Sequence, residues 1–187
     1  MTAMADAPSE RFRRVSTDFG DVVHRVPPDA WSNPAPCEGW LARDVVRHLV
    51  EWVPAVLGRS GIAPFGSLPV EDDPVGAWEA LADWLQAALD DPTVAATEFD
   101  AGPPGMMTVE HAIDMLVTGD VLVHTWDLAT ATGVPAHYDQ AIAQEMLVGM
   151  QPMDEMLRAS GHFGPKVTVA DDADTMSKLV AFTGRHP

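Results

Sequence analysis

The chain has 187 residues, a length that suits one domain, and we expect residues 1–187 to form a single folded unit. Hydrophobic residues make up 47% of it, which is enough for a buried core and excludes general disorder. Its 28 acidic residues outnumber its 11 Lys and Arg residues. The resulting formal net charge of −17 argues against binding to nucleic acids or anionic membranes, which requires a basic surface.

Two further features bear on the compartment of the protein. Cys37 is the single cysteine, so an internal disulfide cannot form, and this fits a reducing cytoplasm. The first residues lack the apolar stretch of a signal peptide, and no run of about 18 apolar residues predicts a membrane span. We therefore expect a cytoplasmic protein.

Three segments in the first half of the chain have the spacing of amphipathic helices, with apolar residues recurring every three or four positions. These segments are residues 9–26, 41–57 and 74–90. Residues 1–8, which precede them, are expected to be disordered. Pro54 is expected to kink the second helix or to end it early, because proline lacks the backbone N–H that a helix interior uses. Residues 58–73, rich in Gly and Pro, predict a long loop.

The longest helical pattern, residues 108–133, lies in the second half of the chain. Thr108 is a suitable N-cap for this helix, and Gly133 is the glycine expected at its end. Residues 91–107, just before it, are expected to be irregular, with a turn at 103–105. Four main helices with a trailing element indicate an all-α helical bundle.

The trailing element contains two further predicted helices. Residues 138–150 form the first, which can continue past Pro152 to Ala159, and a short helix follows from about 173 to 182. Four methionines of this region are expected to fill gaps in the core, since Met packs adaptably. They are Met146, Met150, Met153 and Met156.

Asp120 and His124 lie in the middle of the apolar side of the 108–133 helix. Burying a carboxylate costs free energy unless it is paired, hydrogen-bonded or bound to a cation. Because residues four apart on a helix face the same way, the two side chains can hold one object together. Two interpretations stay open: a divalent metal held by both residues, and a buried Asp–His hydrogen bond that only stabilises the core.

A third ligand from a facing helix would complete a metal site of the kind that helical bundles build. His48, on the inward edge of the 41–57 helix, is the natural candidate. Two imidazoles and one carboxylate leave positions open for water or substrate, as a catalytic metal site requires. This ligand set suits Zn²⁺, with Ni²⁺, Fe²⁺ and Mn²⁺ as alternatives.

Neighbouring residues offer competing or supporting roles. Glu51 could bind a cation together with His48, three residues earlier. Asp127, one turn beyond His124, could accept a hydrogen bond from the second ring nitrogen of that histidine. Cys37 could be a nucleophile if a cation lowered its pKa, although no Lys or Arg adjoins it in the sequence.

Three segments carry a resemblance to a known family: PCEGWLARDVVRHLV (36–50), DVLVHTWDLATATG (120–133) and LVAFTGRHP (179–187). In this order they resemble an actinobacterial family of the DinB-like superfamily, whose relatives include the N-terminal domain of mycothiol-dependent maleylpyruvate isomerase. The resemblance covers essentially the whole chain. It implies a DinB-like four-helix bundle with a short C-terminal extension. It also implies a metal held by a His in the second helix and a carboxylate-x-x-x-His pair in a later helix.

The ligand positions implied by the resemblance match His48, Asp120 and His124. The chain departs from the isomerase relatives in two ways. They place Glu where this chain has Asp120, which is one methylene shorter, so that Asp120 could reach a metal through a water or not at all. They also carry an extra C-terminal domain for which this chain has no room.

The resemblance implies a metal-dependent enzyme acting on a small-molecule substrate with a low-molecular-weight thiol such as mycothiol. The reaction would be a transfer or an isomerisation in which the metal holds the thiolate. A non-enzymatic bundle that binds a small ligand or a protein partner, with a degenerate metal site, is the alternative, and a metal-dependent hydrolase is a third option. A homodimer is a further expectation. The candidate apolar walls for a substrate are Trp40, Trp52 and Phe65.

Overall fold

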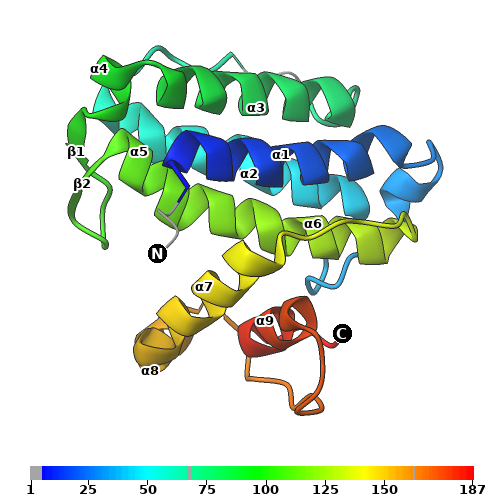
Figure 1. Cartoon of the computed structure of the whole chain (residues 1–187). Helices are drawn as coiled ribbons and strands as arrows, with labels where there is room; N and C mark the ends of the chain where they lie inside the picture. Colours follow the sequence, from blue (N-terminus) through cyan, green and yellow to red (C-terminus); the bar gives the residue numbers. More distant parts are fainter. Residues whose placement is uncertain (1–5, 67–68, 162) are drawn as a thin grey trace.

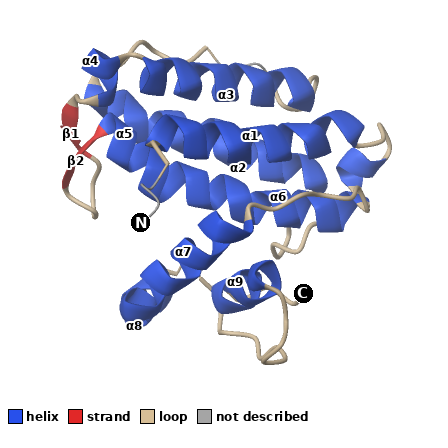
Figure 2. Ribbon diagram, viewed as in Figure 1, coloured by secondary structure: helices blue, strands red, loops and turns tan. Residues whose placement is uncertain are grey.

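Figures 1 and 2 show the computed structural model of the chain, which describes residues 6–66, 69–161 and 163–187. Within these residues the fold is helical apart from one small two-stranded sheet, so the expected all-α class is confirmed. Most of the start expected to be disordered, residues 1–5, lies outside the described residues, and Pro8 already begins the first helix. In the described part, no helix is both long and apolar enough to cross a membrane.

Four helices form the bundle, and their bounds follow the predicted segments closely. They are α1 (Pro8–Arg25), α2 (Ala42–Leu57), α3 (Pro74–Asp90) and α6 (Gly119–Thr132). Helix α1 packs against α3 and α6, and α2 packs against the same two helices, so the order around the bundle is α1, α3, α2, α6. Each helix turns its apolar stripe inward, and Phe19 of α1 meets Trp78 of α3 edge-on, with ring centroids 4.4 Å apart.

Helix α2 continues through Pro54 to Leu57, so of the two expected effects of this proline, a kink or an early end, the early end is wrong. Proline removes one backbone hydrogen bond from the helix interior. Val53 and Leu57, on either side of Pro54, are fully buried in the core. Their burial offsets the lost hydrogen bond and keeps the last turn of α2 in place.

The predicted 108–133 helix is one helical run of three parts: α5 (Val109–Ala112), a π-helical turn η3 (Ile113–Thr118) and α6. Thr108 caps its start, accepting a hydrogen bond from the backbone N–H of His111 at 3.2 Å, and Gly133 ends it with φ 71°. In the wide turn, the hydroxyl of Thr118 donates to the carbonyl of Ile113, five residues earlier, at 3.1 Å.

Residues 91–107 are more ordered than the sequence indicates. A short helix α4 (Pro92–Ala95) precedes an antiparallel hairpin of β1 (Glu98–Asp100) and β2 (Met106–Thr108), in which Phe99 lies opposite Met107. The expected turn at 103–105 is confirmed by the backbone hydrogen bond from Gly105 to Gly102 at 2.8 Å. Strands of three residues are too short to show the alternation by which strands are predicted.

The C-terminal extension consists of α7 (Gln140–Met150), a 3₁₀ turn η4 (Gln151–Met153), α8 (Asp154–Ala159) and α9 (Thr175–Thr183). Helices α7 and α9 pack against each other and both contact α6, below the bundle as viewed in Figure 1. Met150 is buried as expected, but Met153 and Met156 are exposed, so the expected core role is wrong for these two. Helix α8 buries none of its residues and therefore offers no gap for Met156 to fill. Two further 3₁₀ turns, η1 (Ala30–Ser32) and η2 (Gly58–Ser60), flank α2.

Candidate metal centre

The structure brings His48, Asp120 and His124 together where α2 packs against α6. Nε2 of His48 lies 3.3 Å from Oδ2 of Asp120, and Nε2 of His124 lies 3.4 Å from Oδ1 of the same carboxylate. One donor atom from each of the three residues falls within 4.8 Å of the other two. The i, i+4 spacing places the two α6 residues on one face, and the packing of α2 brings the third side chain to it.

The carboxylate of Asp120 lies between the two imidazoles although it is one methylene shorter than a glutamate. Trp52, one turn beyond His48 on α2, donates its indole N–H to Oδ2 of Asp120 at 2.9 Å. Burial would raise the pKa of Asp120, but the charge of His124 and the hydrogen bonds to the carboxylate outweigh it and hold that pKa below its ordinary value. Asp120 is therefore a carboxylate anion that lies between Nε2 of His48 and Nε2 of His124.

His124 is oriented by Asp127, in the role that the spacing of these two residues predicts. Nδ1 of His124 lies 2.8 Å from Oδ2 of Asp127, which is fully buried. Burial would raise the pKa of Asp127, but its contacts with His124 and with Arg185 outweigh burial and keep that pKa low. An ionised Asp127 accepts the Nδ1 proton, so Nε2 is the ring nitrogen that faces Asp120 and the one that a cation would use.

Cys37 lies beside this pair but is poorly suited to be a nucleophile. Its thiol donates to Oδ2 of Asp127 at 3.5 Å, and the guanidinium of Arg185 lies 3.4 Å from Sγ. Burial, followed by the negative charge of Asp127, raises the pKa of the Cys37 thiol to about 12. The thiol therefore stays protonated at neutral pH, and the arginine that the sequence places far away does not reverse this.

Aromatic side chains cover the centre on one side. The ring of Trp40, in the loop before α2, stacks on His124 with centroids 5.9 Å apart and lies 5.0 Å from the ring of His48. Of the other candidate walls, Trp52 contacts Asp120 through its N–H, and Phe65 packs against Trp84 of α3. The side chains of His48 and Asp120 are 33% and 31% exposed, so the centre is open to solvent on another side.

The donor set fits a divalent cation of the zinc type. Two imidazole nitrogens and one carboxylate converge from two helices, and the open side leaves room for further ligands. Glu51, the competing partner of His48, is exposed and is not among the residues that converge in the described part of the chain. A second group of Cys37, His124 and Asp127 is also close enough to hold a cation, but its members already bond to one another and to Arg185.

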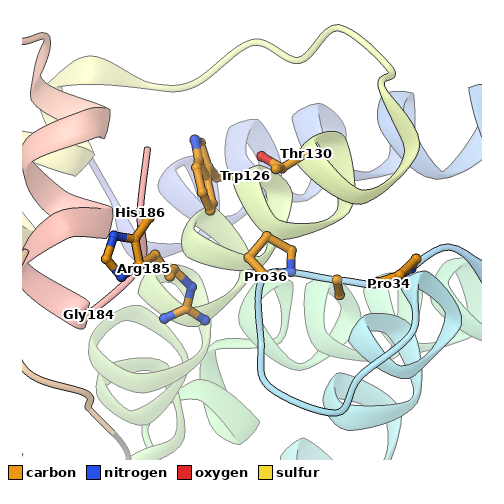
Figure 3. Close-up of a pocket in the computed structure, with 8 residues that line it drawn as sticks. Pro34, Pro36, Trp126, Thr130, Gly184, Arg185 and His186 are labelled. Atoms are coloured by element: carbon orange, nitrogen blue, oxygen red, sulfur yellow. The ribbon is translucent and has the colours of Figure 1, made fainter.

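Arg185 is the residue of this centre that the sequence does not reveal. It lies in the tail after α9, and its guanidinium reaches the carboxylate of Asp127 on α6. A pocket of about 340 Å³, shown in Figure 3, lies against the same arginine. Its lining comes from the loop before α2, from α6 and from the tail: Pro34, Ala35, Pro36, Trp126, Thr130, Gly184, Arg185 and His186. The only sequence signal for Arg185 is its place in the motif of the tail.

Comparisons with known proteins place the chain in a family. Two curated relatives, both described as uncharacterized proteins of Mycobacterium tuberculosis (Rv0738 and MT0763), are each 27% identical to the chain over 184 residues, which cover 92% of this chain and 94% of the relative. No solved structure matches the chain. The family described as "Mycothiol maleylpyruvate isomerase N-terminal domain" matches residues 12–129, which include all three converging residues. The chain belongs to this family.

Proposed function

We propose that the protein is a metal-dependent enzyme that uses a low-molecular-weight thiol to act on a small molecule. His48, Asp120 and His124 would hold the divalent cation, with Zn²⁺ as the best match to the ligand set. The observation that carries the proposal is the convergence of their donor atoms within 4.8 Å at a partly open seam between α2 and α6. Such a constellation is typical of a catalytic rather than a structural metal site.

The thiol would come from a separate molecule. The thiol of Cys37 has a pKa of about 12 and hydrogen-bonds to Asp127, so the chain does not supply a nucleophilic sulfur of its own. The description of the family names mycothiol, which supports a thiol of that kind as the cofactor. A bound divalent cation would stabilise such a thiol as the nucleophilic thiolate and polarise an electrophilic substrate.

The chain's own residues would orient the reactants. Trp40 forms an apolar wall beside both imidazoles and keeps water from that side of the centre. Asp127 holds the ring of His124, and Trp52 holds the carboxylate of Asp120, so the ligands keep their positions without rearrangement. This arrangement suits group transfer to an electrophile or isomerisation through a thiol adduct.

The test is the metal content of protein purified without chelator or metal-affinity resin, measured by plasma mass spectrometry. Wild type is compared with His48→Ala, Asp120→Ala and His124→Ala. His111→Ala is the matched control, since His111 lies on the same helical run but is exposed. We expect one metal per chain in wild type and in the control, and loss of the metal in the other three. An empty wild-type protein, even after loading with Zn²⁺, would rule out the proposal.

An Asp120→Glu variant tests how the carboxylate takes part. Its extra methylene restores the side chain found in the isomerase relatives and keeps the negative charge. We expect Asp120→Glu to retain the metal that Asp120→Ala loses. Metal retained in Asp120→Ala would mean that this carboxylate is not a direct ligand.

A second candidate function is a non-enzymatic bundle that binds a small ligand. The observation in its favour is that Asp120 is already contacted by His48, His124 and Trp52, so these polar groups satisfy one another without a cation. Mycothiol and a panel of electrophiles separate the two candidates. Consumption of thiol and electrophile supports the enzyme, whereas binding of the thiol without any turnover supports the binding bundle.

A further inference from the structure

We propose that Arg185, in the C-terminal tail, is a positioning residue of the metal centre, acting on His124 through Asp127. The inference rests on the proposed metal site and adds that the C-terminal extension completes it. Its basis is a chain of contacts from Arg185 to Asp127 and from Asp127 to His124.

Arg185 binds the carboxylate with two of its nitrogens. Nε donates to Oδ1 of Asp127 and a terminal nitrogen donates to Oδ2, both at 2.7 Å. The other terminal nitrogen donates to the hydroxyl of Thr183 at 3.0 Å. A two-pronged contact of this kind fixes the plane of the carboxylate as well as its distance, which a single donor cannot do.

The carboxylate that Arg185 holds is the one that orients the candidate ligand. Oδ2 of Asp127 receives both the guanidinium and the Nδ1 proton of His124. Asp127 has no exposed surface, and the Arg185 side chain is 16% exposed, so water cannot replace the arginine without rearrangement. Loss of Arg185 would leave a buried carboxylate that either turns away from His124 or takes up a proton.

The fold determines where Arg185 can reach. Its backbone N–H donates to the carbonyl of Val180 at 3.0 Å, just after Gly184 has ended α9 in a left-handed conformation. Figure 3 shows Arg185 in the tail after α9, among the residues that line the pocket. Because α9 packs against α7 and α6, the guanidinium stays at Asp127 only while the C-terminal extension is docked.

The test is a set of variants chosen to separate the contact from general damage to the extension. Arg185→Gln removes the charge and the two-pronged contact, whereas Arg185→Lys keeps the charge with a single point of contact. Asp127→Asn interrupts the series of contacts from Arg185 to His124 at Asp127. Arg158→Gln is the matched control, since Arg158 anchors the same extension through the carbonyls of Gly164 and Phe182. The double variant, Asp127→Asn with Arg185→Gln, completes a double-mutant cycle for these two residues.

The first readout is the affinity for Zn²⁺, measured by competition with a chromophoric chelator on protein whose helical content matches wild type. We expect roughly 10- to 100-fold weaker binding in Arg185→Gln, a smaller loss in Arg185→Lys and no change in Arg158→Gln. The double variant should bind no more weakly than Asp127→Asn alone, because both changes interrupt one chain of contacts. If Arg185→Gln does not fold, Arg185→Lys carries the comparison.

The second readout needs no metal. In metal-free protein, the ring N–H of His124 held by Asp127 should give a low-field proton resonance, identified by its loss in His124→Ala. We expect it in wild type and Arg158→Gln, and broadened or absent in Arg185→Gln. A wild type that binds no metal but shows this dependence would refute the proposed function and leave the positioning role intact. Wild-type affinity together with an unchanged resonance in Arg185→Gln would overturn the inference.

Discussion

The indole of Trp52, on α2, donates its N–H to Oδ2 of Asp120, on α6, over 2.9 Å. The bond crosses the seam between the two helices, so it links the packing of the bundle to the position of a candidate metal ligand. It also occupies one lone pair of the carboxylate and leaves Oδ1 facing His124.

Trp52→Phe is expected to weaken metal binding by roughly 10-fold, because it removes this N–H while keeping an aromatic ring in the same space. The affinity for Zn²⁺, measured by competition, tests the prediction. Trp84→Phe is the control, since the indole of Trp84 donates instead to the carbonyl of Ala63 in the loop before α3. Equal affinities in both variants would mean that the Trp52 bond does not hold the carboxylate in place.

Cys37 is expected to react slowly with iodoacetamide in the folded protein. Its pKa is raised from 9.0 to about 12, so the thiolate that performs the attack is scarce at pH 8. We expect alkylation at least about 10-fold slower than in urea-unfolded protein, where the thiol regains its ordinary pKa. Mass spectrometry of timed samples gives both rates. Rapid alkylation in the native state would contradict the assignment of Cys37 as a protonated hydrogen-bond donor.

Gly184→Ala is expected to destabilise the protein more than Gly133→Ala. Both glycines have a positive φ, 101° and 71°, and an alanine there costs about 1–2 kcal/mol in backbone strain. A Cβ on Gly184 would in addition lie 2.7 Å from Cα of Gly164, whereas a Cβ on Gly133 meets nothing within 4 Å. Urea unfolding of the two variants measures the difference. Equal free energies of unfolding would show that the tail can move away from Gly164 at no cost.

Asp139 is expected to make the stability of the protein depend on pH at the acid end. The carboxylate caps α7 through the N–H groups of Ala141 and Ile142 and accepts a bond from Arg14 of α1 at 2.9 Å. Burial would raise its pKa, but these contacts outweigh burial and lower that pKa from 3.8. A lowered pKa means that the stabilisation is present above pH 3.8 and is lost as the pH falls through the lower, folded value.

Asp139→Asn keeps an acceptor at the cap but removes the charge. We therefore expect its free energy of unfolding to be lower than that of wild type at neutral pH and to fall less steeply on acidification below about pH 4. Urea unfolding at a series of pH values measures both slopes. Asp72→Asn, at an exposed carboxylate, should follow the wild-type curve. A wild-type slope in Asp139→Asn would exclude this carboxylate as a source of the acid sensitivity.

Much of the fold could be predicted because each bundle helix carries its own apolar stripe. The spacing of three or four residues placed α1, α2 and α3 within a residue or so of their observed bounds. The hairpin of β1 and β2 could not be predicted, since its strands are held by pairing with each other and are too short to show a pattern. The π turn η3 could not be predicted from the spacing either, because it changes the hydrogen bonding of the helix without ending it.

The sequence by itself determined that Asp120 and His124 share one face of a helix, since that follows from local geometry. It also placed His48 on the inward edge of another helix, and it put Asp127 one turn beyond His124. Only the tertiary structure decided that α2 packs beside α6, and so that the three donor atoms meet. It alone brought Arg185 to Asp127, 58 residues earlier in the chain. The physical reason is that periodicity reports which side of a helix is buried, whereas the partner of that side depends on how all the helices pack together.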